Sequence, residues 1–171
     1  IPEHDDLAAF PRGAYALASL AKTVAKNAVF FFPSYYCNDS LAPLRATGAE
    51  LVFYRVRENM CPDWDDVFSR AKVKKPDIFV LVHYFGMIND VSSAITFVEQ
   101  NDCILLEDAA HVLMPYSGMA RKNSIHLYSP HKLLALPPIG LLSYSRSIPV
   151  GVLEHYRAGL KRGDFVWVAK R

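Results

Sequence analysis

Apolar runs of strand length alternate with helical patterns along almost the whole chain, and this alternation limits the possible folds more than any other feature. The clearest run is DIFVLVHYF at 77–85, and continuously apolar strands of this kind are buried on both faces of a sheet. Strands that alternate with helices predict a three-layer α/β/α domain with a mostly parallel sheet. We expect further strands at 28–32, 50–56, 103–107, 124–129 and 139–145, and helices at 14–26, 40–48, 63–72, 90–101 and 152–162.

The same pattern predicts local features of the fold. The last two expected strands are joined by a connection too short for a crossover helix, so they are antiparallel or are not neighbours in the sheet. We therefore expect one antiparallel strand. Asp63 and Asp90 directly precede helical patterns, which predicts that each caps a helix N-terminus.

Length, composition and charge favour a single globular domain over 1–171, since 51% of the 171 residues are hydrophobic and 21% are charged. The net charge is +2 and the basic residues are scattered, so we expect no nucleic-acid partner. No apolar run reaches transmembrane length and no signal peptide opens the chain, so we expect no membrane partner. The chain begins IPEHDD, without Met, which indicates a processed protein or a fragment.

Three cysteines, Cys37, Cys61 and Cys103, stand far apart in the sequence without the spacing of metal ligands. An odd number of cysteines and the lack of a CxxC pair predict reduced thiols, a cytoplasmic location and no bound metal. We expect Cys61 and Cys103 to be buried and inert.

Unusual polar residues gather at the ends of the expected strands. Ligands of open α/β sheets bind beyond the carboxyl ends of the strands, so these positions are candidates for a site. The residues concerned are Pro33 to Asn38, His83 to Gly86, Asp108 to His111, and Ser129 to Lys132.

Asp108 lies just past an apolar strand, and His111 follows three residues later. Asp108 either caps the following turn or points into a crevice and holds a cationic ligand group. His111, taken alone, is typical of a hydrogen-bonded histidine in the core. Gly13 opens a helical pattern, where free amides and the helix dipole can bind a phosphate. A glycine at this position is also typical of an ordinary helix start without a ligand. The chain has no Walker loop and no GxGxxG motif, so ATP and dinucleotides are not favoured.

Lys132 is the only Asp, Glu, Lys or Arg residue in the stretch YSPHKLLALPPIGLLSYS at 128–145. A lysine in apolar surroundings either extends its amine to solvent or is kept nucleophilic for Schiff-base chemistry. Pyridoxal phosphate (PLP) needs a lysine for its aldehyde, an anion cup for its phosphate and a carboxylate for its ring nitrogen. Lys132, Gly13 and Asp108 supply these groups in a workable order.

The order of motifs from Pro11 to Ser145 resembles the fold type I PLP enzymes: a helix-start glycine, FFPSYYCN, VHYFG, EDAAH, and a lysine 24 residues after the aspartate. The chain is most similar to the DegT-like sugar aminotransferases, with HYFG and EDAAH as the most specific motifs. The resemblance implies the large domain of such an enzyme, with the C-terminal small domain of the family absent. It also implies a homodimer, with apolar surface exposed where the missing domain or the partner packs.

The resemblance assigns roles to individual residues. Asp108 would pair with the pyridine nitrogen, and Lys132 would form the Schiff base with the aldehyde. His111 would lie near the ring hydroxyl oxygen. The remaining contacts would be the amides of Gly13 and Ala14 on the phosphate, Ser129 and His131 also on the phosphate, and Cys37, or else Tyr36, on the face of the ring.

Three functions follow from these observations. The leading hypothesis is a PLP-dependent aminotransferase that carries an amino group from an amino acid to a keto sugar. The chain reads SPHK where sugar aminotransferases have SxHxxK, and this spacing is closer to the cysteine desulfurases, although no cysteine is evidently placed for that reaction. The other alternative is a degenerate domain that keeps the fold and serves as a binding or assembly module.

Overall fold

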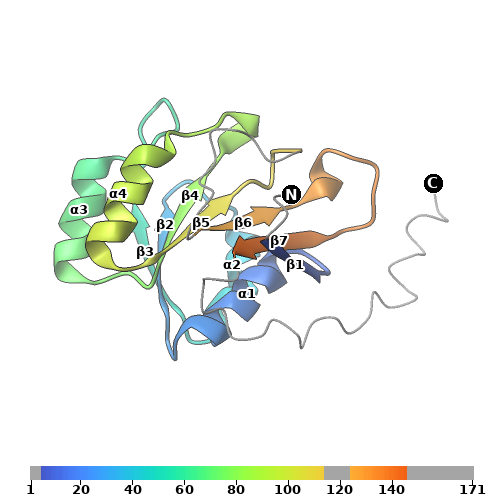
Figure 1. Cartoon of the computed structure of the whole chain (residues 1–171), viewed down its shortest axis with the longest axis horizontal. Coiled ribbons are helices and arrows are strands. Elements are labelled where there is room, and N and C mark those ends of the chain that lie inside the picture. The colour runs from blue at the N-terminus through green and yellow to red at the C-terminus, as the bar shows by residue number, and fades with distance from the viewer. Residues whose placement is uncertain (1–4, 114–123, 146–171) are drawn as a thin grey trace.

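The computed structural model describes residues 5–113 and 124–145, which form a seven-stranded sheet between two helical layers. Figure 1 shows helices α3 and α4 on one side of the sheet and α1 and α2 on the other. The strands are β1 (Asp5–Phe10), β2 (Val29–Pro33), β3 (Glu50–Tyr54), β4 (Ile78–Val82), β5 (Ile104–Asp108), β6 (Ser124–Tyr128) and β7 (Gly140–Ser145). The helices are α1 (Gly13–Val24), α2 (Asn38–Arg45), α3 (Trp64–Val73) and α4 (Val91–Asn101), with short 3-10 turns at Tyr84–Gly86 and Pro130–Lys132.

The spatial order of the strands is β1-β7-β6-β5-β4-β2-β3, and β7 runs antiparallel to both of its neighbours. The pairs from β6 to β3 are all parallel. The predicted α/β architecture with one antiparallel strand is therefore confirmed. Among the described helices, none is long and apolar enough to cross a bilayer.

Strand β2 shows why this sequence must be buried on both faces. Phe30 and Phe32 pack with α1 and α2, whereas Phe31, between them, packs with α3 and α4. All three phenylalanines are fully buried. Burying one such side chain stabilises the fold by about 1.5–3 kcal/mol, so both helical layers are held by the same five-residue strand.

The structure corrects the prediction at several element boundaries. The sequence prediction omitted β1, an edge strand that begins with two aspartates and pairs only with β7. The strand expected over 77–85 ends at Val82 and is followed by the 3-10 turn at Tyr84–Gly86, in which Phe85 adopts a left-handed backbone with φ 55° and ψ 25°. The helix expected at 152–162 lies outside the described residues.

The two predicted helix caps behave differently. The carboxylate of Asp90 accepts a hydrogen bond from the Ser92 amide at 3.0 Å and caps α4 as expected. Asp63 occupies the N-cap position of α3, but its side chain makes no capping bond. Its carboxylate pairs instead with Arg55 at 3.2 Å and Arg57 at 3.5 Å, so the predicted N-cap position is confirmed but a side-chain cap is not.

Gly140 sets the junction between β7 and the start of α1. A β-carbon on Gly140 would overlap the backbone nitrogen of Gly13, so only glycine allows the strand to pass this close to the helix. The contact holds the N-terminus of α1 at the edge of the site.

Candidate functional site

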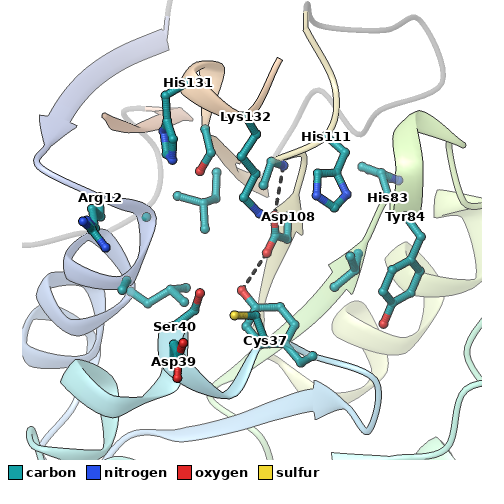
Figure 2. Close-up of a pocket in the computed structure, with 18 of the residues that line it drawn as sticks. Arg12, Cys37, Asp39, Ser40, His83, Tyr84, Asp108, His111, His131 and Lys132 are labelled. Atoms are coloured by element: carbon teal, nitrogen blue, oxygen red, sulfur yellow. Dashed lines mark hydrogen bonds between the residues drawn. The ribbon is translucent and has the colours of Figure 1, made fainter. Parts of the chain in front are cut away.

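A cleft of about 610 Å³ lies at the carboxyl ends of β2, β4, β5 and β6. The prediction from sequence placed the site at this edge of the sheet. All of the residues singled out from sequence as catalytic or cofactor-binding line the cleft: Gly13, Ala14, Cys37, Asp108, His111, Ser129, His131 and Lys132. Figure 2 shows Asp108 between Lys132, His111 and Cys37.

Asp108 is the last residue of β5, and its side chain is almost completely buried at 6% exposure. Its Oδ1 accepts a hydrogen bond from the Ala110 amide at 3.0 Å, and its Oδ2 accepts one from the Tyr36 hydroxyl at 2.6 Å. The turn-capping interpretation is therefore confirmed, while the role of Asp108 toward a ligand stays a prediction. The carboxylate caps the turn after β5 with one oxygen, and it also lies in the cleft.

Tyr36 was considered from sequence only as an alternative contact for a ring face. Its own ring packs against Phe32, with the centroids 4.8 Å apart and the planes at 60°. Burial raises the pKa of Tyr36 well above its ordinary value, and the nearby Asp108 carboxylate raises it further. The phenol therefore stays protonated and donates its hydrogen to Asp108.

His111 forms one wall of the cleft together with Phe85. The two rings are parallel within 7°, with centroids 5.8 Å apart, and the His111 Nδ1 accepts the Phe85 amide hydrogen at 3.3 Å. Partial burial lowers the pKa of His111, and the positive charge of Lys132 lowers it further against the opposing effect of Asp108. The imidazole is thus neutral near pH 7. Because Nδ1 is an acceptor, its proton is on Nε2.

Lys132 ends the 3-10 turn after β6, and its side chain extends toward Asp108 in Figure 2. Its apolar sequence neighbours do not enclose it, which agrees with the alternative of an amine extended to solvent. Lys132 is exposed, and so are Leu133, Leu134 and Leu136, at 46%, 45% and 40%. The turn directs these leucines outward, so residues adjacent in sequence do not surround the amine.

Ser129 and Gly13 lie against each other at the start of α1. A β-carbon on Gly13 would lie 3.2 Å from the Ser129 Oγ and 3.6 Å from the Leu127 side chain, so any larger residue would fill this space. The N-cap residue Arg12 makes no side-chain capping bond and lines the cleft. The first amides of a helix have no partner within it, and these, with the buried Ser129 hydroxyl, form a group of donors suited to an anion.

His131 is partly committed to holding the loop that leads to β7. Its Nδ1 lies 2.9 Å from the Ile139 carbonyl oxygen and 3.2 Å from the Ile139 amide nitrogen. A contact from His131 to a phosphate therefore has to use Nε2.

The three cysteines differ in their environments. Cys37 is exposed at the N-cap of α2, and hydrogen bonds from the Ser40 side chain and backbone lower the pKa of its thiol. Cys61 and Cys103 are only partly buried, so the prediction that both are buried is wrong. Burial nevertheless raises the pKa of Cys103 to about 12, which keeps that thiol unreactive.

A second polar cluster shares His83 with the lining of the cleft, and the sequence interpretation missed its other two members, Glu107 and His126. Glu107, completely buried, contacts the His83 Nε2 at 2.8 Å and the His126 Nε2 at 3.2 Å. The His83 Nδ1 accepts the Asn89 amide hydrogen at 3.1 Å, so the proton on Nε2 points at Glu107. Burial alone would raise the pKa of Glu107, but the hydrogen bonds from His126 and His83 outweigh it and lower the pKa. The alternation of side chains along β5 could have predicted this cluster, because adjacent residues of a strand, such as Glu107 and Asp108, point to opposite faces of the sheet.

Within the described ranges, 5–113 and 124–145, no cluster of three or more His, Cys, Asp or Glu side chains could hold a metal ion.

The sequence matches no protein-family model and no curated protein. Solved structures do share the fold. They include S. venezuelae DesV, in complex with a ketimine intermediate, at a TM-score of 0.71 and 20% identity over 84% of this chain and 41% of that one. A second is 3-amino-5-hydroxybenzoic acid synthase, with a TM-score of 0.68 and 20% identity over 82% of this chain and 38% of that one. A third is a protein from Bacillus cereus described as a PLP-dependent aminotransferase, with a TM-score of 0.67 and 16% identity over 82% of this chain and 41% of that one.

The predicted fold class is confirmed by this likeness. The chain has the α/β fold of the fold type I PLP enzymes. It spans about two fifths of the length of these proteins.

Proposed function

We propose that this chain is the cofactor-binding large domain of a PLP-dependent aminotransferase that carries an amino group from an amino acid to a keto sugar. The observation that carries the proposal is the meeting of Lys132, Asp108 and Gly13 in one cleft, since each supplies a different group that the cofactor needs. The sugar acceptor rests on the sequence resemblance to the DegT-like enzymes.

The residues of the cleft fit PLP in their chemistry. The buried Asp108 carboxylate, with two donors already on it, retains lone pairs for a ring N–H. The space that a side chain at position 13 would fill gives a phosphate access to the amides of Gly13 and Ala14 and to the Ser129 hydroxyl. The exposed Lys132 amine is accessible to an aldehyde. Cys37 would contact a face of the ring.

When bound, PLP withdraws electrons from the α-carbon of an amino acid joined to it. Lys132 would hold the aldehyde carbon and, once displaced by the amino donor, would move the proton at the α-carbon as a general base and acid. Asp108 would keep the ring nitrogen protonated. His111 would donate its Nε2 hydrogen to the ring hydroxyl oxygen, because its Nδ1 is held by the Phe85 amide. His131 would bind the phosphate through Nε2.

The proposal extends to a homodimer in the cytoplasm. Exposed apolar side chains near the cleft support a covering partner or domain. Phe85 is 63% exposed, Tyr35 56% and Tyr15 44%, and all three of these large side chains line the cleft.

Absorption spectroscopy tests the proposal. Addition of PLP to the purified protein should produce a visible absorption band that Lys132→Ala abolishes and Lys22→Ala, at an exposed lysine in the last turn of α1, leaves intact. Glutamate should then bleach that band as its amino group is transferred. Absence of the band in the wild type would contradict the cofactor assignment. A stable band with glutamate would favour the degenerate binding module, and sulfide release from cysteine would favour a desulfurase.

A further inference from the structure

We propose that Tyr36 is a positioning residue that holds the Asp108 carboxylate in place for the ring nitrogen of the cofactor. This inference rests on the proposed function and adds a residue to it. Nothing in the sequence motifs predicts this role, since Tyr36 lies 72 positions from Asp108.

Two donors from different parts of the fold fix the rotation of the Asp108 carboxylate. The Tyr36 hydroxyl donates to Oδ2 at 2.6 Å, and the Ala110 amide donates to Oδ1 at 3.0 Å. The hydrogen bond from the Ala110 amide lies within the turn after β5, whereas the hydrogen bond from Tyr36 comes from the connection between β2 and α2. Each oxygen keeps a second lone pair, so the carboxylate can still accept a ring N–H.

Tyr36 is itself held rigidly enough to act in this way. Its ring packs on Phe32, the buried residue at the end of β2, and Cys37 after it is the N-cap of α2. Strand β4 lies between β2 and β5 in the sheet, and its last residue, Val82, is in register with Asp108. Tyr36 thus reaches past the end of β4 to Asp108 and ties together elements two strands apart.

The hydrogen bond from Tyr36 to Asp108 is short and charge-assisted. An O–H that donates to a carboxylate at 2.5–2.7 Å is a charge-assisted bond of about twice the strength of a neutral one, and 2.6 Å lies in that range. Burial and the Asp108 charge raise the pKa of Tyr36, so the phenol remains a donor throughout the neutral range. The hydroxyl thus holds the carboxylate oxygen by a donated hydrogen bond and leaves the other lone pairs of the group for the ring nitrogen.

The test compares PLP with its analogue in which a ring C–H replaces the ring nitrogen. Tyr36→Phe keeps the aromatic ring and removes only the hydroxyl. We expect it to weaken PLP binding about 10-fold, the usual size for a hydrogen bond to a charged group, and to change binding of the analogue less than about 2-fold. Binding is measured by equilibrium titration, without turnover.

Tyr54→Phe is the matched control. The Tyr54 hydroxyl also makes a buried 2.6 Å bond, but to the Val80 carbonyl oxygen, away from the residues that line the cleft. This variant should lower thermal stability and leave the ratio of the two dissociation constants unchanged. Circular dichroism establishes that both variants are folded.

A double-mutant cycle makes the inference independent of packing effects. If Tyr36 acts through Asp108, Tyr36→Phe should cause no further loss of PLP affinity in an Asp108→Asn background. Equal weakening for PLP and the analogue, additive losses in the cycle, or no loss at all would each overturn the role of Tyr36. Failure of the wild type to bind either compound would instead overturn the proposed function.

Discussion

Glu107 and Asp108 are adjacent carboxylates on one strand, but they face opposite sides of the sheet and have different surroundings. Both are buried, at 0% and 6% exposure. Glu107 is held by the side chains of His83 and His126 at 2.8 and 3.2 Å, and it does not line the cleft, although His83 does. Asp108 is held by one tyrosine hydroxyl and one amide, and it lines the cleft.

The difference shows how one strand end can supply both structure and chemistry. Glu107 contacts two imidazoles, and one of these, His83, is bonded to the Asn89 amide and so fixes the turn after β4. That turn carries Phe85, which supports His111 in the cleft wall. We infer that Glu107 stabilises the frame of the site, whereas Asp108 remains available to a ligand.

Among the substitutions that distinguish the roles of the two carboxylates, Glu107→Gln should cause the largest change, a loss of unfolding free energy. Loss of one partner from a buried, hydrogen-bonded charge cluster costs about 3 kcal/mol of unfolding free energy. PLP affinity of the folded variant should change less than about 3-fold, because the bonds to Asp108 are intact. Urea denaturation measures the first quantity and a PLP titration the second. Strong loss of affinity with normal stability would reverse our assignment of the two residues.

Asp108→Asn should show the opposite pattern. An asparagine can still accept one of the two hydrogen bonds, so we expect a stability loss of about 1 kcal/mol or less. It cannot keep a ring nitrogen protonated, and PLP should bind roughly 30-fold more weakly, a difference of about 2 kcal/mol. The same two measurements apply. Unchanged PLP affinity would remove Asp108 from the cofactor site.

The smallest expected difference is in the acid range. Because the folded pKa of Glu107 is lowered, its ionised form stabilises the protein above the ordinary glutamate pKa, and this contribution is lost as the pH falls below about 4.5. Wild-type unfolding free energy should therefore fall more steeply between about pH 5 and pH 3 than that of Glu107→Gln. Parallel pH profiles for the two proteins would show that the Glu107 cluster carries no net charge interaction.

Much of the fold could be predicted because its strands are so apolar. The run at 78–82 is buried at every position, and only a sheet covered on both faces can accommodate it. Strand β1 could not be predicted in the same way. It is an edge strand with a half-exposed Leu7, and its pairing depends on β7, more than a hundred residues later in the chain.

The candidate site was predictable in its membership but not in its contacts. Strand ends placed Asp108, His111 and Lys132 at one edge of the sheet, and the cleft contains all three. The exposure of Lys132 depends on the direction in which the 3-10 turn points the leucines that follow it. The order of residues in the sequence does not give this direction. The Tyr36 bond to Asp108 depends on the order of β2, β4 and β5 in the sheet.

The most direct measurement is to identify the residue that PLP labels. Reduction of the PLP-treated protein with borohydride makes the link between an amine and the aldehyde permanent, and peptide mass spectrometry then locates it. Our account predicts modification of Lys132 in the wild type and in Lys22→Ala, and no modification of the corresponding peptide in Lys132→Ala. Label on another lysine, or no label under conditions in which the protein is folded, would contradict the assignment of this cleft as a PLP site.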